Sequence, residues 1–106
     1  MEHIVLLQFK PEVTPEAITA LGNSILALKE VVPGIIDMAF GEDLKVGHAQ
    51  GFTHGLVARM ESPEVLAAYD VHPDHVAVVK VLRELAANFL TFDFVSSRDA
   101  PVRSRV

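Results

Sequence analysis

The sequence predicts an α+β domain in which one four-stranded, mainly antiparallel sheet carries helices on one face. Two observations indicate this class: four short apolar or alternating runs typical of strands, and longer segments whose apolar residues recur every three or four positions. A threonine or serine followed by proline begins two of the longer segments, as at the starts of helices. The 106 residues, half of them apolar, correspond to one compact domain.

The first strand and helix are indicated by residue type and spacing. Residues 3–9 form a short apolar run, which predicts a strand. Thr14 and Pro15 then provide a capping residue and a proline at the first helical position, and the helix is expected to run to about residue 31. Pro33 and Gly34 end it. Its buried face is expected to contain Ile18, Leu21, Ile25, Leu28 and Val32.

Two further strands and a polar loop follow. The second strand alternates Ile36, Met38 and Phe40 with Asp37 and Ala39. Residues 41–51 are polar and glycine-rich, which predicts a loop with a solvated His48. The third strand is expected to extend through about Met60 and to direct one set of side chains to a single face: His54, Leu56, Ala58 and Met60.

The second half of the chain predicts two helices and a last strand. Ser62 and Pro63 repeat the helix-start signal, and the short helix that follows breaks near His72 because a proline disfavours helical geometry at the residue before it. The next helix is expected from about Pro73 to Ala87, with Val76, Val79, Leu82 and Ala86 facing inward. Residues 89–97 then predict the last strand, in which Leu90, Phe92 and Phe94 alternate with Thr91 and Asp93.

The order β-α-β-β-α-α-β is that of a ferredoxin-like, split βαβ protomer. Its first strand is apolar on both sides, with Val5 and Leu7 on one side and Ile4 and Leu6 on the other. Because the helices can cover only one face of the sheet, a second copy related by twofold symmetry is expected to cover the open face. The sequence therefore predicts a homodimer, and with it a dimeric α/β barrel.

Composition excludes several classes of function. Nine Lys and Arg against 14 Asp and Glu give a net charge of −5, so no basic surface for nucleic acid is expected. No apolar run approaches the length of a membrane span and the start is not basic, so we expect a cytoplasmic protein without a membrane partner. The absence of cysteine removes disulfides, thiolate nucleophiles and zinc–thiolate sites.

Four histidines are candidates for a site. His3 and His54 are in phase with the apolar residues of their strands and should point inward, while His72 and His75 flank Pro73. For a single inward histidine, an imidazole that bonds a backbone carbonyl in the core is a sufficient explanation. Several polar rings on one apolar face each need a partner, however, and a shared pocket for a small molecule would supply those partners.

His75 has the strongest individual signal. It is the third residue of the predicted helix, where the positive end of the helix dipole disfavours the imidazolium and preserves a neutral base. Tyr69, the only tyrosine, lies on the preceding helix and could donate a hydrogen bond into the same space. A base and a phenolic donor are what proton abstraction beside a carbonyl requires.

A metal site is the alternative use of these histidines. His72 and His75 could share a face with Asp70. The spacing lacks the glutamate of the H-E-x-x-H zinc motif, and no glycine-rich phosphate loop or serine nucleophile context occurs. We therefore expect neither a metal nor another cofactor.

Several segments together resemble the stress-responsive dimeric α/β-barrel (Dabb) family. They are His3-Ile-Val-Leu-Leu-Gln-Phe-Lys, Val32-Pro-Gly, Gly51-Phe-Thr-His-Gly, Tyr69-x-x-His-Pro-x-His75 and Phe92-Asp-Phe. The resemblance covers about residues 1–97 and implies a ferredoxin-like protomer whose sheet faces that of a partner. We assign residues 1–98 to this domain and expect residues 99–106 to form a flexible tail.

The resemblance also implies a reaction. One plant member of the family closes a linear polyketide thioester by intramolecular aldol condensation without a cofactor. Its catalytic histidine and tyrosine correspond to His75 and Tyr69, and two pocket histidines to His3 and His54. A pocket tyrosine of that enzyme is replaced here by Ile25, which changes the wall available to a substrate.

We therefore expect a pocket for a hydrophobic, oxygenated small molecule and a cofactor-free cyclase or aldol-type enzyme. His75 and Tyr69 are the expected catalytic residues, and the expected substrate-binding residues are His3, His54, His72 and Ile25. One alternative is a non-catalytic stress-response or ligand-binding protein that uses the same pocket. Another alternative is a monooxygenase of the wider dimeric-barrel group that acts on quinols or haem. Fold analogy alone supports this alternative.

Overall fold

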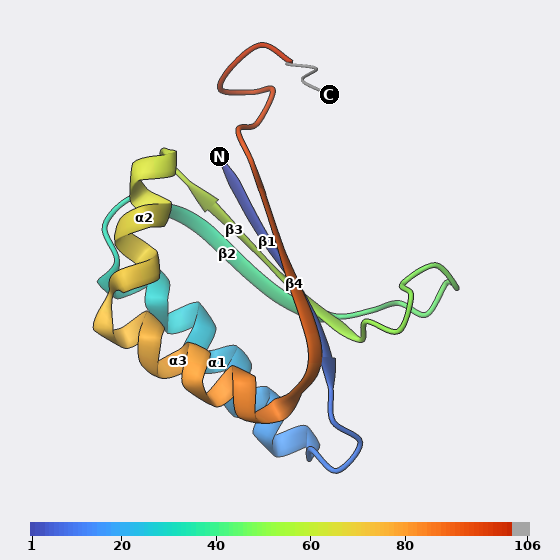
Figure 1. The fold of residues 1–106 in the computed structure, drawn as a ribbon. Coiled ribbons are helices and arrows are strands. Elements are labelled where there is room, and N and C mark those ends of the chain that lie inside the picture. The colour runs from blue at the N-terminus through green and yellow to red at the C-terminus, as the bar shows by residue number, and fades with distance from the viewer. Residues whose placement is uncertain (103–106) are drawn as a thin grey trace.

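The computed structural model describes residues 1–102, which form a four-stranded antiparallel sheet with three helices on one side (Figure 1). The strands lie in the order β2-β3-β1-β4. The predicted ferredoxin-like α+β fold is confirmed. The elements are β1 (Glu2–Phe9), α1 (Pro15–Val31), β2 (Ile35–Glu42), β3 (His54–Met60), α2 (Pro63–Val71), α3 (Pro73–Leu85) and β4 (Ala86–Phe94).

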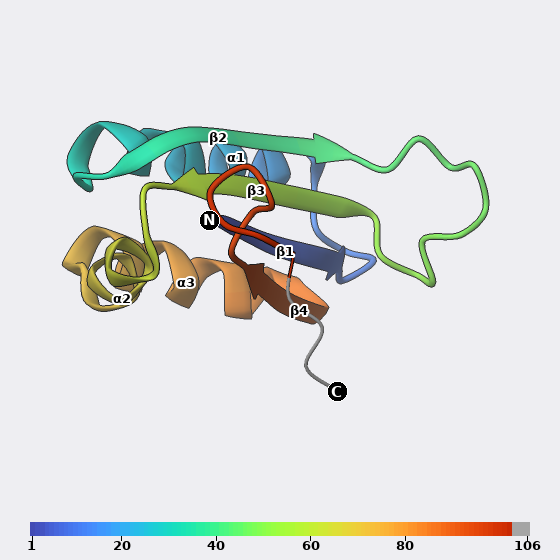
Figure 2. The ribbon, with the colours of Figure 1, turned by 90° about the horizontal axis from the view of Figure 1, so that it is seen from above.

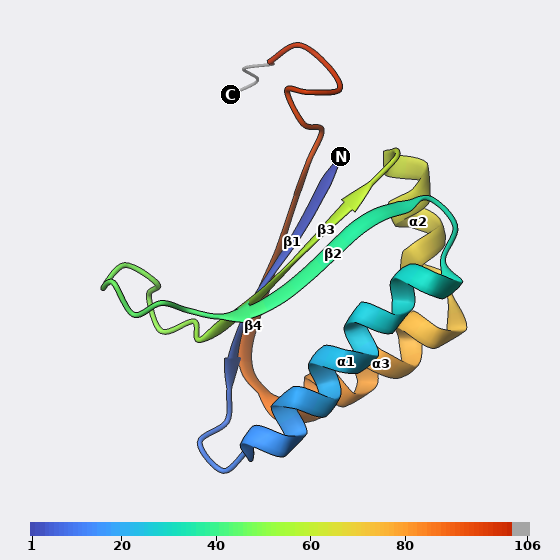
Figure 3. The same cartoon turned by 180° about the vertical axis from the view of Figure 1, so that it is seen from behind.

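The three helices form one layer against the sheet. α1 and α3 run side by side across it, and α2 leads into α3 at one end (Figure 3). The loop between β2 and β3 extends beyond the end of the sheet, away from the helices (Figure 2). Within residues 1–102, all three helices lie on one side of the sheet and its other face carries none. None of the helices described between residues 1 and 102 is both long and apolar enough to cross a membrane.

Both predicted capping residues begin their helices. The Thr14 hydroxyl accepts a hydrogen bond from the backbone N–H of Ala17 at 3.2 Å, and the Ser62 hydroxyl accepts one from that of Val65 at 3.4 Å. In both helices a proline occupies the first turn, where its missing N–H has no intrahelical acceptor to lose. These local signals fix where the helices begin.

The turn after α1 requires glycine. Gly34 has a φ of +91°, which a residue with a side chain rarely adopts. A Cβ at this position would also lie 2.5 Å from Cγ2 of Val65. This close approach packs the start of α2 against the turn that leads into β2.

The core lies between the sheet and the helices. Leu21, Ile25 and Leu28 of α1 are buried there as predicted, opposite Leu7 of β1 and Met60 of β3. Further buried members are Val5, Val32, Ile35, Met38, Leu56, Ala58, Tyr69 and Leu82. Among residues with fully buried side chains, Tyr69 is one of the largest, although it carries a polar hydroxyl.

Two expectations about inward-facing residues were wrong. The β2–β3 register shifts between Ile35 and Asp37, so Ile35 is buried and Ile36 is 46% exposed. An extra residue in a strand reverses the alternation on one side of it, which periodicity alone does not reveal. In α3, Val76 is 54% exposed and borders a cavity. The helix ends at Leu85, so Ala86 belongs to β4, although it packs against the core as expected.

The helix-free face of the sheet is apolar near β4. Ile4 and Leu6 of β1 pair with Phe92 and Leu90 of β4, and these side chains alternate with the residues that face the helices. Phe92 is 60% exposed, and Phe94 and Val57 are also exposed. We call this set the open-face patch: Ile4, Leu6, Val57, Leu90, Phe92 and Phe94.

The segment after β4 returns to the start of the chain. The Asp99 carboxylate accepts a hydrogen bond from the amino group of Met1 at 3.0 Å, and Arg98 donates one to Glu2 at 3.1 Å. Residues 103–106 of the predicted tail lie outside the described residues.

Candidate active site

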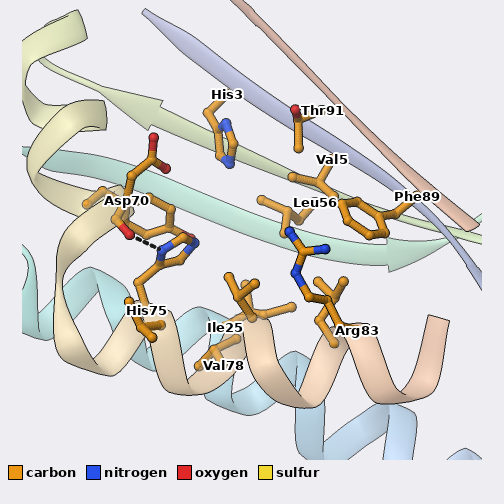
Figure 4. Close-up of a pocket in the computed structure, with 14 residues that line it drawn as sticks. His3, Val5, Ile25, Leu56, Asp70, His75, Val78, Arg83, Phe89 and Thr91 are labelled. Atoms are coloured by element: carbon orange, nitrogen blue, oxygen red, sulfur yellow. Dashed lines mark hydrogen bonds between the residues drawn. The ribbon is translucent and has the colours of Figure 1, made fainter.

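A cavity of about 320 Å³ opens between α3 and the helix-facing side of the sheet (Figure 4). Five elements besides α3 contribute to its wall. The lining residues that carry polar groups are His3, Tyr69, Asp70, His75, Arg83 and Thr91, and the remaining ones are apolar. The size suits a small molecule.

His75 presents one ring nitrogen to this cavity. Its Nδ1 lies 3.3 Å from the backbone carbonyl oxygen of Asp70, and because a carbonyl only accepts, Nδ1 carries the hydrogen. Nε2 therefore holds the lone pair, and it lies on the cavity side of the ring (Figure 4). Burial lowers the pKa of His75, although the Asp70 carbonyl and carboxylate act in the opposite direction. The imidazole is thus a neutral base at pH 7.

Tyr69 supplies a protonated phenol beside this base. Its ring centroid lies 4.0 Å from that of His75, with a 38° angle between the planes. Burial, aided by the charge of Asp70, raises the pKa of the Tyr69 phenol to about 12. The hydroxyl therefore keeps its proton through the physiological range and can donate it in a hydrogen bond.

His3 joins this pair from β1. The rings of His3 and Tyr69 are in an edge-to-face arrangement, with centroids 5.7 Å apart and planes at 66°. Its Nδ1 lies 2.5 Å from a carboxylate oxygen of Asp93, the residue directly opposite on β4. Because the carboxylate accepts, the Nδ1 of His3 carries the hydrogen and the orientation of the ring is fixed.

Sequence reasoning missed Asp93 as a site residue. It shares a face of β4 with Phe89 and Thr91, and both of those line the cavity. Pairing the first strand with the last, antiparallel, would have placed this carboxylate opposite His3. The alternation of residues in the last strand therefore indicates Asp93 as a site residue only when the register between the first and last strands is known.

The other two predicted histidines lie elsewhere. His54 is at the opposite end of the sheet from His3, where its ring packs against those of Phe9 and Phe40 at centroid distances of 5.0 Å and 5.8 Å. Burial lowers its pKa. His72 caps α3, since its Nδ1 accepts a hydrogen bond from the N–H of Asp74 at 3.1 Å. The pocket expected for four histidines therefore forms around two of them.

Ile25 contributes an apolar wall. It projects from α1 and is 1% exposed, and Leu56 and Val79 line the same cavity. Among residues 1–102, no group of three or more His, Asp or Glu side chains is arranged to hold a metal ion. The chemistry that these lining residues themselves can supply is proton transfer and hydrogen bonding.

Fold and cavity together define a ferredoxin-like α+β protomer with Tyr69 and His75 side by side at a cavity on the helix side of its sheet. Residues 1–96 match the stress-responsive A/B barrel domain, and the chain belongs to this Dabb family.

Known proteins are similar to this chain in sequence or in structure. The chain is 33% identical over 99 residues to a stress-response A/B barrel domain-containing protein of Arabidopsis thaliana, covering 92% of this chain and 37% of that protein. It is 28% identical over 95 residues to olivetolic acid cyclase of Cannabis sativa, covering 89% and 94%. A dimeric ferredoxin-like protein of unknown function from Thermobifida fusca superimposes with a TM-score of 0.79 at 25% identity, covering 90% and 89%. The chain thus spans little more than a third of the Arabidopsis protein but nearly all of the cyclase.

Proposed function

We propose that this protein is a homodimeric enzyme that performs cofactor-free cyclase or aldol-type chemistry on a hydrophobic, polyketide-like small molecule. The observation that carries the proposal is the pairing of a neutral His75, with Nε2 toward the cavity, and a protonated Tyr69 beside it. The similarity to olivetolic acid cyclase over nearly its whole length supports the same reading.

The reaction follows from the protonation states of the pair. Nε2 of His75 removes a proton from the carbon between two carbonyls of the substrate, and the Tyr69 hydroxyl donates a hydrogen bond to the enolate oxygen that forms. The enolate carbon then attacks a second carbonyl of the same chain, which forms a carbon–carbon bond and an alkoxide. The imidazolium of His75 returns the proton to that alkoxide. No electron acceptor is consumed.

His3 is a positioning residue in this scheme. Its ring packs against that of Tyr69 in an edge-to-face arrangement and is itself held by Asp93, so it limits the orientations that the phenol can take. The apolar walls around the pair exclude water from the enolate and accept the hydrocarbon part of the substrate.

The homodimer in this proposal forms through the open-face patch. The patch is apolar and uncovered among the described residues, and a solved protein of similar fold is dimeric. A large exposed apolar area on a small acidic domain is typical of a protein interface. The cavity lies on the opposite side of the sheet, so dimerisation leaves it accessible.

Turnover of β-polyketone thioesters tests the catalytic part of the proposal. We expect the wild type to cyclise at least one of them and His75→Ala to lose about 10²–10⁴-fold in kcat/KM. His48→Ala removes an exposed loop histidine and should retain full activity. If the wild type binds such compounds without turning them over and His75→Ala only weakens binding, the protein is a ligand-binding member of the family instead.

A further inference from the structure

Arg83 places a positive charge at the cavity. It lines the cavity from α3, and its guanidinium lies 5.2 Å from the ring centroid of Phe89 (Figure 4). Of the arginines among residues 1–102, Arg59 and Arg98 form ion pairs with carboxylates, whereas Arg83 forms none. Among the described residues, Arg83 therefore places a permanent cation at the cavity with no carboxylate within ion-pair distance.

The cavity therefore has two chemically different ends. His75 and Tyr69 form a neutral acid–base end, and Asp70, the acidic residue in the lining, lies at that end as well. Arg83 follows His75 by eight residues on the same helix, which separates their Cα atoms by about 12 Å. A ligand that contacts both His75 and Arg83 must therefore be elongated.

We infer that Arg83 binds a carboxylate at the end of the substrate remote from the carbon that His75 deprotonates. The planar guanidinium can donate two parallel hydrogen bonds to a carboxylate. Its position over Phe89 restrains the plane of the group, and the Thr91 hydroxyl on the facing strand is a further donor in the lining. The inference rests on the proposed function for its acid–base end, and it specifies the substrate class as linear carbon acids with a terminal carboxylate.

Binding of two matched probes tests this assignment separately from catalysis. The probes are a linear β-diketone with a carboxylate at its far end and the corresponding primary amide, titrated by isothermal calorimetry. The wild type should bind the carboxylate roughly tenfold more tightly than the amide, as expected for a charge-assisted pair. Arg83→Gln should bind both equally, and Arg83→Lys should retain part of the preference. Lys80→Gln makes the same charge change on α3 away from the cavity lining and should keep the full preference.

The outcomes are distinguishable. Equal binding of the two probes by the wild type, or a preference that survives Arg83→Gln, overturns the role of Arg83. In either case a His75-dependent turnover of neutral thioesters leaves the proposed function intact. Failure of the wild type to bind either probe, together with no turnover, overturns both.

Discussion

The phenol ring of Tyr69 contacts the imidazole of His75, although the two residues belong to different helices. His72 alone separates α2 from α3. Its N–H donates to the Tyr69 carbonyl at 3.1 Å, and its Nδ1 accepts from Asp74 at 3.1 Å, so it ends one helix and begins the next. A local turn around a proline therefore brings the phenol of Tyr69 and the imidazole of His75 together.

Replacement of Tyr69 by phenylalanine should separate the contribution of the hydroxyl to catalysis from that of the ring. Tyr69→Phe removes the donor to the enolate and keeps the buried ring, so we expect kcat to fall roughly a hundredfold. The loss should be smaller than that of His75→Ala, and the thermal midpoint should stay close to that of the wild type. Steady-state kinetics with the best thioester checks this. Unchanged kcat would remove Tyr69 from the reaction.

The pH profile should follow the protonation of His75. Since burial lowers its pKa and the base must be neutral, kcat/KM should rise with pH through a midpoint below the ordinary value of about 6.5. The raised pKa of Tyr69 predicts no loss of the donor on the alkaline side up to at least the ordinary tyrosine value of about 10. An acid limb centred above the ordinary imidazole value would contradict this account.

Stability should depend on pH in the same region. The folded pKa values of His54 and His75 are lowered, so the unfolded chain takes up protons more readily as pH falls. The free energy of unfolding should therefore decrease as pH falls from about 7 through the lowered pKa values. Denaturant titrations of the wild type and His75→Gln measure this. The free energy of unfolding should decrease less in the variant, because of these two histidines only His54 then contributes.

A charge on the open-face patch should disrupt the dimer. Phe92 is exposed in the protomer, whereas Val5 and Leu7 face the helices, so Phe92→Glu tests the interface without disturbing the core. We expect the wild type to have about twice the chain mass by light scattering, and Phe92→Glu to shift toward the 11.6 kDa protomer. Val71→Glu adds the same charge at an exposed site on α2 and should remain dimeric. A monomeric wild type at micromolar concentration would refute the interface.

Folding should not require a metal. His72 already uses Nδ1 to cap α3, which removes one nitrogen from any site that it could share with His75. Elemental analysis of dialysed protein should find metal well below one equivalent per chain. A stoichiometric metal that His72→Ala abolishes would overturn this expectation.

Local signals made most of the fold predictable. The caps at Thr14 and Ser62, together with the spacing of apolar residues, placed the helices, because these features act within a few residues of one another. The pairing of His75 with Tyr69 was predictable for the same reason. The bulge at Ile36 was not, since one inserted residue changes the phase without altering composition.

Long-range features of the site were harder to predict. The contact between His3 and Asp93 depends on the register of two strands from opposite ends of the chain. His54 was expected to share the pocket because it lies in phase with an inward face, but phase gives no position along the strand. Helical spacing does not distinguish Arg83 from a solvated residue, because its position over Phe89 depends on how α3 packs against β4.

The contact between Tyr69 and His75 and the walls of the cavity are encoded in separate parts of the chain. Tyr69 and His75 lie within seven consecutive residues, and their contact depends on a turn that those residues form themselves. The walls come from distant segments, with Ile25 on α1 and Phe89 on β4. Under the proposed function, substitutions at the walls therefore alter which molecules bind while the contact between Tyr69 and His75 stays the same. Related chains can thus differ in substrate and still share one proton-transfer pair.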